Sequence, residues 1–406
     1  MVRMDNTSAL LNSLVLSRCF GDNFPMQLHF SKIFCIAAFV LFTAAAWAKD
    51  CFVYFGTYTD TTSKGIYVSR LDMDSGKLSA PELAAAVTSP NFLAVPPDGH
   101  FLYAALRADN TPGAVAAFAR DGRTGSLKLL DQKSSGGEGN CFVGVDAAGQ
   151  NVFAANYNSG SVKSFHVNAN GMLGDGTVVE HHGHSVNPAR QTSAHAHCFV
   201  GAPAGRFALA CDLGMDKVMV YRVDPDTAAL TPNNPPFATV APGSGPRHIA
   251  FSPNGKTACV ICEMACAVKA FDWNGSKGTL HERQTISLLP PGLHQDTFTA
   301  AEIAYRPDGK FVYATVRGPN APGANTISVL AVRRKKLSLI QNISCDGDFP
   351  RGMGIDPSGR WLIIGNQKSG TVTVFGIDTD TGKLTPTGQA LDVGSVVDVK
   401  FAPMED

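Results

Sequence analysis

The sequence has few charged residues and no excess of either sign. Its 34 Lys and Arg residues balance 34 Asp and Glu residues, and charged residues make up 17% of the 406, below the roughly 25% that is usual in globular proteins. Nucleic-acid-binding proteins concentrate positive charge to capture phosphates. The one basic run here, residues 333–336 with the sequence RRKK, is interpreted as a solvent-exposed hairpin tip. We therefore expect no nucleic acid partner.

Several familiar functional motifs are also missing. The sequence has no P-loop, no G-x-G-x-x-G on a strand–helix unit and no G-x-S-x-G, so nucleotide-binding and serine-hydrolase functions lack their signatures. No segment beyond the N-terminal region has sustained helical periodicity, so we expect almost no α-helix. The abundance of apolar residues (44%), with 40 Gly and 24 Pro, instead indicates a folded, turn-rich, all-β protein.

The cysteine content does not indicate a disulfide scaffold or a zinc site. The region after residue 48 has eight cysteines, too few for its length to form a cystine-stabilised fold. Cys259, Cys262 and Cys266 have spacings that could suggest a metal. Strand alternation, however, would place Cys259 and Cys262 on opposite faces of a sheet. We interpret these residues as buried thiols or as one disulfide.

The N-terminal region has the form of a signal peptide. Residues 33–48 are almost wholly apolar, follow Lys32 and end in Ala46-Trp47-Ala48. A positive residue, a short apolar stretch and an A-x-A pattern are typical of export signals, and about 16 apolar residues are fewer than the roughly 20 that a membrane-spanning helix needs. The alternative is an uncleaved anchor.

These features predict that residues 1–48 are an upstream extension and a signal peptide. A start at Met26 would give the signal peptide its usual length, so residues 1–25 would be the extension or a misassigned start. We expect residues 49–406 to form one exported domain, periplasmic or secreted, with no stable membrane association after cleavage. If the leader does not function, the protein would be cytoplasmic.

An internal repeat organises the rest of the chain. An apolar strand, a turn with glycine and a second apolar strand recur six times, as in VPPDGHFLYAAL and YRPDGKFVYATVR. The turn glycines lie 50 to 56 residues apart, at Gly99, Gly149, Gly205, Gly255, Gly309 and Gly359. Each hairpin is followed by a second pair of strands, as in GTVTVFGIDTDTGKL. Such a period is typical of the four-stranded blades of a β-propeller.

The seventh repeat is divided between the two ends of the chain. The sequence ends with VVDVKFAPMED, which reads as a first strand, and DCFVYFGTYTD at residues 50–60 reads as its second strand. Pairing these segments would complete a seventh blade. We therefore predict an all-β, seven-bladed β-propeller closed by its N- and C-terminal strands, an arrangement that pairs the edges which these two strands would otherwise expose.

The repeat also predicts which residues meet at one rim of the channel. Antiparallel pairing puts the start of each first strand and the end of each second strand at the same end of a blade. The predicted rim positions are Asn91, Cys141, His197, Arg247, Ala301 and Arg351, with Arg107, Tyr157, Leu213, Glu263, Arg317 and Gln367, and their neighbours Asn156, Asp212, His248, Glu302 and Asn366.

This rim gathers four arginines, two glutamates and two histidines. Guanidinium groups bind phosphate or carboxylate bidentately, and an imidazole or a carboxylate can move a proton. The pattern predicts a site for a small anionic substrate; alternatively, the charges pair with one another and line a wet channel. A His-rich stretch lacks an accompanying pattern of Cys, Asp or Glu ligands; it contains His181, His182, His184, His195 and His197. We predict no metal ion and no other cofactor.

Several segments also carry a family resemblance, among them FGTYTDTTSKGIYV, SVNPARQTSAHAH, GPRHIAFSPNG and FPRGMGIDPSGRWLIIGNQ. Over residues 51–406 the sequence resembles the seven-bladed lactonase family that contains propeller-type 6-phosphogluconolactonase and 3-carboxy-cis,cis-muconate lactonizing enzyme. The resemblance implies a site of His197, Arg247, Glu263 and Arg317, the same four that the rim analysis gives. Phe142 stands where the family usually has histidine, and the segment after Arg317, GPNAPGANTIS, is longer than usual.

The resulting hypothesis is a lactone hydrolase of the 6-phosphogluconolactonase type. Arg247 and Arg317 would bind the substrate's anionic group and stabilise the oxyanion, and Glu263 and His197 would activate water. Further substrate-binding candidates are Arg351, His248, Asn156 and Asp212. The alternatives are a carboxymuconate-type cycloisomerase, a lactonase for an unphosphorylated sugar lactone, and a propeller that binds a partner without catalysis.

Overall fold

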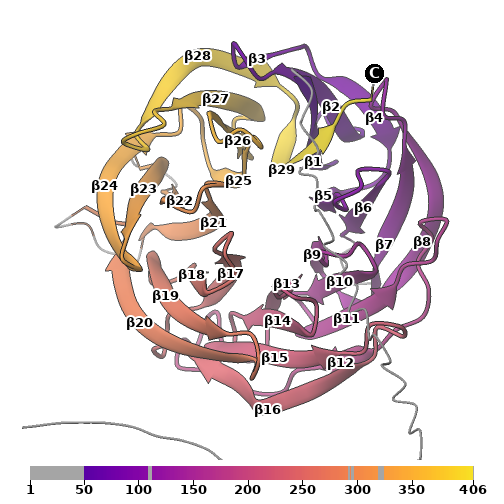
Figure 1. Ribbon diagram of the computed structural model, residues 1–406, viewed down its shortest axis with the longest axis vertical. Helices are drawn as coiled ribbons and strands as arrows, with labels where there is room; N and C mark the ends of the chain where they lie inside the picture. The colour runs from indigo at the N-terminus through magenta and orange to yellow at the C-terminus, as the bar shows by residue number, and fades with distance from the viewer. Residues whose placement is uncertain (1–49, 108–111, 291–292, 294–296, 319–323, 406) are drawn as a thin grey trace, which may run out of the picture. The chain divides into compact units, whose positions relative to one another are not determined.

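In the computed structural model, the strands are arranged in a ring of seven blades around a central channel (Figure 1). The structure describes residues 50–107, 112–290, 293, 297–318 and 324–405. All regular elements among them are β-strands, and the described part of the chain has no helix that could cross a membrane. The predicted signal peptide lies outside these residues. The predicted all-β, seven-bladed propeller is confirmed.

Six blades are four-stranded sheets of consecutive antiparallel strands. They comprise β5 (Pro90–Ala94), β6 (Phe101–Leu106), β7 (Pro112–Arg120) and β8 (Leu127–Glu138); β9 (Asn140–Val145), β10 (Asn151–Asn156), β11 (Ser161–His166) and β12 (Val178–Glu180); β13 (Ala196–Gly201), β14 (Phe207–Asp212), β15 (Lys217–Val223) and β16 (Leu230–Thr239); β17 (Pro246–Phe251), β18 (Thr257–Cys262), β19 (Ala267–Asn274) and β20 (Thr279–Ser287); β21 (Thr299–Tyr305), β22 (Phe311–Arg317), β23 (Thr326–Arg333) and β24 (Lys336–Ser344); and β25 (Pro350–Ile355), β26 (Trp361–Asn366), β27 (Thr371–Ile377) and β28 (Leu384–Asp392).

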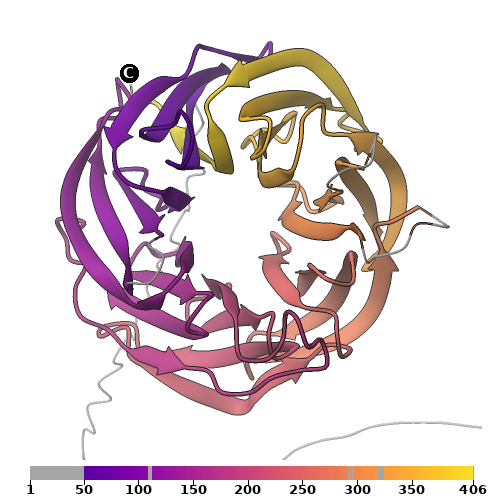
Figure 2. The same ribbon diagram turned by 180° about the vertical axis from the view of Figure 1, so that it is seen from behind.

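The remaining blade joins the two ends of the chain. The C-terminal strand β29 (Ser395–Pro403) is its inner strand and pairs with β1 (Asp50–Tyr58), which pairs with β2 (Gly65–Asp72). The short strands β3 (Lys77–Leu78) and β4 (Glu82–Ala86) both pair with β2. Seen from behind, the C-terminal strand again completes the ring beside the first strands (Figure 2). The predicted closure by terminal strands is thus confirmed.

Apolar side chains fill the spaces between neighbouring blades. Both faces of the inner strands are buried, and these strands are nearly continuous apolar runs such as FLYAAL in β6, as expected when a sheet packs against sheets on both sides. Cys259 and Cys262 belong to different core clusters, so they lie on opposite faces of β18 as predicted. All eight described cysteines are free and buried. The interpretation as buried thiols is confirmed, and no disulfide forms among the described residues.

The basic run at residues 333–336 closes the hairpin between β23 and β24. Arg333 is paired with Lys336, and all four side chains are exposed. The predicted hairpin tip is confirmed.

A β-bulge recurs at the start of the innermost strand of every blade. In each, the register shifts so that one or two residues have no partner on the neighbouring strand. These residues are Asn91, Cys141, His197, Arg247, Ala301 with Glu302, Arg351 and Val397. Bulges redirect side chains and are frequent next to active sites. The same backbone irregularity thus places one or two unpaired residues of each blade at the same end of the channel.

The closure can be tested by truncation. Ending the chain after Gly394 removes β29 and leaves β1 with an unpaired inner edge, so we expect loss of the cooperative thermal transition followed by circular dichroism. Ending it after Pro403 keeps β29 and should preserve the transition. Equal melting curves for the two truncated chains would contradict a closure that depends on β29.

Candidate active site

A cavity of about 330 Å³ lies at the end of the channel where the innermost strands begin. Its volume is near the lower end of the roughly 300–1,000 Å³ that is typical of small-molecule sites. It is lined by Arg107, Cys141, Tyr157, Asn158, Arg190, His197, Glu263, Arg317 and Arg351. Most of these are bulged residues or residues at the ends of second strands. Seven of the predicted rim positions therefore line this cavity.

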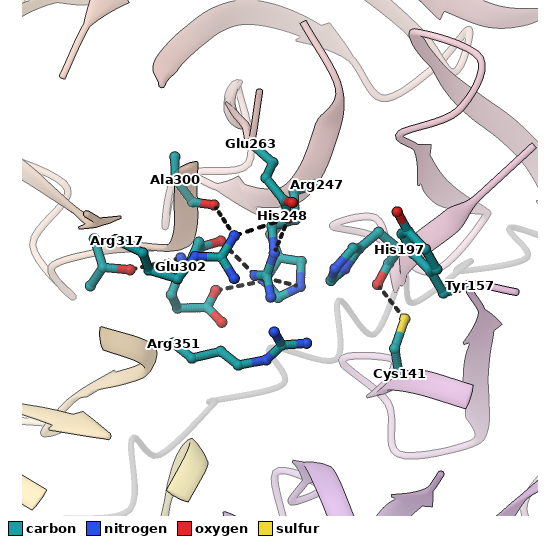
Figure 3. A network of polar contacts seen from close by, with 12 residues as sticks. Cys141, Tyr157, His197, Arg247, His248, Glu263, Ala300, Glu302, Arg317 and Arg351 are labelled. Carbon is teal, nitrogen blue, oxygen red and sulfur yellow. Dashed lines mark hydrogen bonds and ion pairs between the residues drawn. The ribbon is translucent and has the colours of Figure 1, made fainter. Parts of the chain in front are cut away.

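Glu263 is the centre of an ion cluster in this wall. It directly follows β18, where its N–H donates to the carbonyl oxygen of Gly245 at 2.7 Å. Its Oε2 accepts from Arg247 Nε and lies 3.1 Å from Arg317 Nη2, while Oε1 accepts from Arg190 Nη2 at 2.8 Å. Figure 3 shows the Glu263 carboxylate with Arg247 and Arg317. One carboxylate thus holds three guanidinium groups.

The cluster fixes the charge of Glu263. Burial raises the pKa of this carboxyl, but Arg317, Arg247 and Arg190 outweigh burial and lower it to about 2. Glu263 is therefore ionised at any physiological pH. A carboxylate with so low a pKa and with both oxygens occupied is a weak proton acceptor.

Arg247 and Arg317 are almost completely buried and also bind backbone carbonyl groups. Arg247 Nη1 donates to Ala301 O at 2.6 Å, and Arg317 Nη2 donates to Ala300 O at 2.9 Å. Burial lowers the pKa of both, that of Arg317 to about 9. Arg317 lines the cavity, whereas Arg247 does not. Arg247 instead pairs with Glu263 on the side of the carboxylate that faces away from the cavity.

His197 presents a neutral imidazole to the cavity. It is the bulged residue of β13, and neither ring nitrogen hydrogen-bonds to another described residue. Burial lowers its pKa well below the ordinary value, and the positive charge of Arg247 lowers it further. Its ring packs edge-on against Tyr157, with the centroids 5.6 Å apart. A neutral, unbonded imidazole beside a cationic wall is suited to accept a proton.

His248 and Glu302 lie at a second cavity in the channel. This cavity, of about 280 Å³, is also lined by Phe92, Phe142 and Lys400. His248 Nδ1 lies 2.9 Å from Glu302 Oε1, and burial lowers the pKa of His248 to about 4. The His248 ring makes edge contacts with both Phe92 and Phe142. Phe142, the departure from the family pattern, is thus part of this aromatic group.

Besides Arg247, two predicted binding residues line neither cavity. Asn156 is fully buried and donates to Ser135 O of β8 in the preceding blade and to Ser161 Oγ of its own blade. Asp212 accepts from the N–H groups of His195 and Met215, and its Oδ2 lies 2.6 Å from His181 Nδ1. These hydrogen bonds within the protein account for the presence of Asn156 and Asp212 as structural residues, without a role in binding substrate.

Sequence reasoning missed Arg190, which lies outside the repeat. It belongs to the long connection between β12 and β13, where Asn187 Oδ1 accepts from the Arg190 N–H. Its Nη2 reaches Tyr157 OH as well as Glu263. The available signal was the family-like segment SVNPARQTSAHAH, which contains this arginine. The extended segment after Arg317 is only partly described, since residues 319–323 lie outside the described chain.

The described residues contain no group of three His, Cys, Asp or Glu side chains that could hold a metal ion. His181, from the His-rich stretch, lies between Asp212 and Tyr221 OH in a hydrogen-bonded chain. Four arginines and one glutamate line the first cavity, so its wall carries an excess of positive charge. Such a wall attracts a small anion.

Fold and cavity together define a closed β-propeller with a cationic cavity in its channel. The chain belongs to the family described as Lactonase, 7-bladed beta-propeller, which matches residues 52–401. It is 33% identical over 350 residues to a 6-phosphogluconolactonase of Bacillus subtilis, covering 86% of this chain and 97% of that relative. A 6-phosphogluconolactonase of Formosa agariphila is 30% identical over 348 residues, covering 84% of this chain and 96% of that relative.

A solved structure supports the same conclusion. The periplasmic gluconolactonase of Pseudomonas aeruginosa is similar with a TM-score of 0.80 and 30% identity, covering 88% of this chain and 100% of that one. The predicted membership of the propeller lactonase family is confirmed.

Replacing Glu263 tests the ion cluster. In Glu263→Gln, Arg247 and Arg317 stay buried without their counter-charge, so we expect a loss of about 3–5 kcal/mol in the free energy of unfolding, measured by urea denaturation. Arg190→Gln removes the half-exposed partner and should cost only about 1 kcal/mol or less. If the two variants are equally stable, the cluster does not depend on the buried pairs.

Proposed function

We propose that the protein is a lactone hydrolase of the 6-phosphogluconolactonase type, converting 6-phosphoglucono-1,5-lactone and water to 6-phosphogluconate. The observation that carries this proposal is the neutral His197 imidazole beside an excess of guanidinium groups in one cavity. Ester hydrolysis needs a proton acceptor for water and positive charge for the oxyanion, and this cavity offers both. The named relatives support the choice of lactone.

In this mechanism His197 is the general base. Water attacks the lactone carbonyl carbon while His197 takes one of its protons, and a tetrahedral oxyanion forms. The ring C–O bond then breaks, and the His197 imidazolium returns the proton to the leaving alkoxide. One water is consumed, and the product is an open-chain hydroxy acid, which ionises.

Arg317 is the group proposed to stabilise the oxyanion, because it lines the cavity and Glu263 fixes its orientation. A donor held in place before the reaction stabilises developing charge without a reorganisation cost. Glu263 then acts as a positioning residue, since its pKa of about 2 makes it a poor base. Arg247 supports it from the buried side.

Export of the protein is a second part of the proposal. The leader pattern in residues 33–48 supports it, and a structural neighbour is named a periplasmic gluconolactonase. An exported enzyme would meet lactones outside the cytoplasm, so unphosphorylated sugar lactones belong among the substrates to be tested.

The activity is tested by lactone opening above the spontaneous rate. We expect the wild-type protein to open 6-phosphoglucono-1,5-lactone, and His197→Gln and Arg317→Gln each to lose on the order of 100-fold in kcat. His100→Gln, an exposed histidine in the turn between β5 and β6, is the matched control and should keep wild-type activity. Equal rates in wild type and both site variants would refute the assignment. A spectral change with carboxymuconates alone would favour the cycloisomerase, and binding without turnover a non-catalytic propeller.

The pH profile tests which group is the base. His197 works in its neutral form, and burial holds its pKa well below the ordinary value, so acidification should remove activity only below pH 6.5. We expect kcat/KM for glucono-1,5-lactone, which has no titrating phosphate, to be constant from pH 6.5 to 7.5. A rise through neutral pH would show that His197 does not carry this depressed pKa.

A further inference from the structure

We propose that Arg351, positioned by Tyr58, binds the substrate's anionic group remote from the lactone carbonyl and so selects charged lactones over neutral ones. The inference rests on the proposed lactonase function and assigns a specificity-determining residue to it. The shared chemistry is that of a phosphate or carboxylate held by a guanidinium fork.

The arginines around the cavity differ in what they already bind. Arg190, Arg247 and Arg317 each form an ion pair with Glu263. Arg351 forms no ion pair with any described residue. Its Nη2 donates to Tyr58 OH at 3.3 Å, and its guanidinium carbon lies 5.7 Å from the centroid of the Tyr58 ring. Its positive charge therefore remains uncompensated by a carboxylate.

The backbone places this charge in the cavity. Arg351 is the bulged residue of β25 and is half-buried in the cavity wall. Figure 3 shows its side chain extended toward the space below Arg247 and His248, across from His197. Tyr58 is the last residue of β1 in the closing blade. The guanidinium of Arg351, from one blade, is thus held by Tyr58 of the next blade.

The neighbouring groups respond to this uncompensated charge. After burial, the positive charge of Arg351 is among the causes that lower the pKa values of Arg247, Arg317 and His197. A bound anion at Arg351 would relieve this repulsion. Binding of a charged substrate is therefore favoured at this point, and Glu263 does not compete for it.

The two sides of the cavity would then bind different parts of the substrate. Glu263 with Arg317, from β18 and β22, lies on the side proposed for the reacting carbonyl. Arg351 enters from β25, in the next blade around the ring. A substrate with a lactone at one end and an anion at the other can contact both walls at once. A neutral lactone contacts only the first.

The experiment compares three lactones with wild type, Arg351→Gln, Arg351→Lys and Tyr58→Phe. The substrates are 6-phosphoglucono-1,5-lactone, glucaro-1,4-lactone with a carboxylate, and neutral glucono-1,5-lactone. We expect Arg351→Gln to lower the kcat/KM ratio of charged to neutral substrate by roughly 10- to 100-fold, mainly through KM, because one charged hydrogen-bonded contact is lost. Arg351→Lys should lose less, and Tyr58→Phe, which keeps the ring, least.

Arg190→Gln is the matched control within the cavity. Its guanidinium is paired with Glu263, so this variant should affect charged and neutral lactones by the same factor. Selective loss for only the phosphorylated or only the carboxylated substrate identifies which anion Arg351 binds. Equal loss for charged and neutral lactones in Arg351→Gln, or no loss at all, overturns the proposal.

A binding measurement separates this inference from the proposed function. Isothermal titration with 6-phosphogluconate should give at least tenfold weaker binding for Arg351→Gln than for wild type. If the wild-type protein opens no lactone yet shows this difference, the hydrolase assignment fails and the anion site stands. If it opens lactones but binding does not depend on Arg351, the anion site fails and the hydrolase stands.

Discussion

The buried carboxylate of Glu263 is the constraint on which the site depends. A charge taken out of water must be paired, and Glu263 is paired with arginines from β17, from β22 and from the connection before β13. Its oxygens fix where Arg317 lies and leave Arg351 as an uncompensated cation. The same pairing deprives Glu263 of basicity and leaves proton transfer to His197. One buried ion cluster thereby determines which residue in the cavity transfers protons and which arginine is free to bind an anion.

The repeat supplies the geometry in which this cluster forms. Each innermost strand begins with a bulge, so every blade has one or two unpaired residues at the same end of the channel. The backbone is nearly identical around the ring, whereas the side chain at this position changes from Cys141 to His197, Arg247 and Arg351. Function therefore lies in the choice of side chain at a repeated bulge, as expected when a common fold hosts a particular site.

Most of the fold could be predicted from the sequence because its signals are local. Turn glycines at a regular spacing and strand alternation define the blades, and a constant offset from each turn locates the bulged residues. Arg190 could not be found in this way, since its loop has no periodicity. Asn156 and Asp212 occupy positions next to the rim, but alternation turns their side chains into hydrogen bonds within the protein. No sequence pattern predicts that Arg247 is buried beside Glu263 and does not line the cavity.

The most direct test is a crystal structure with 6-phosphogluconate, the product of the proposed reaction. The account predicts that the ligand occupies the cavity of about 330 Å³, with its carboxylate beside His197 and Arg317 and its phosphate on Arg351. A ligand bound outside this cavity, or one whose phosphate contacts Arg317 while Arg351 remains bonded only to Tyr58, would contradict it.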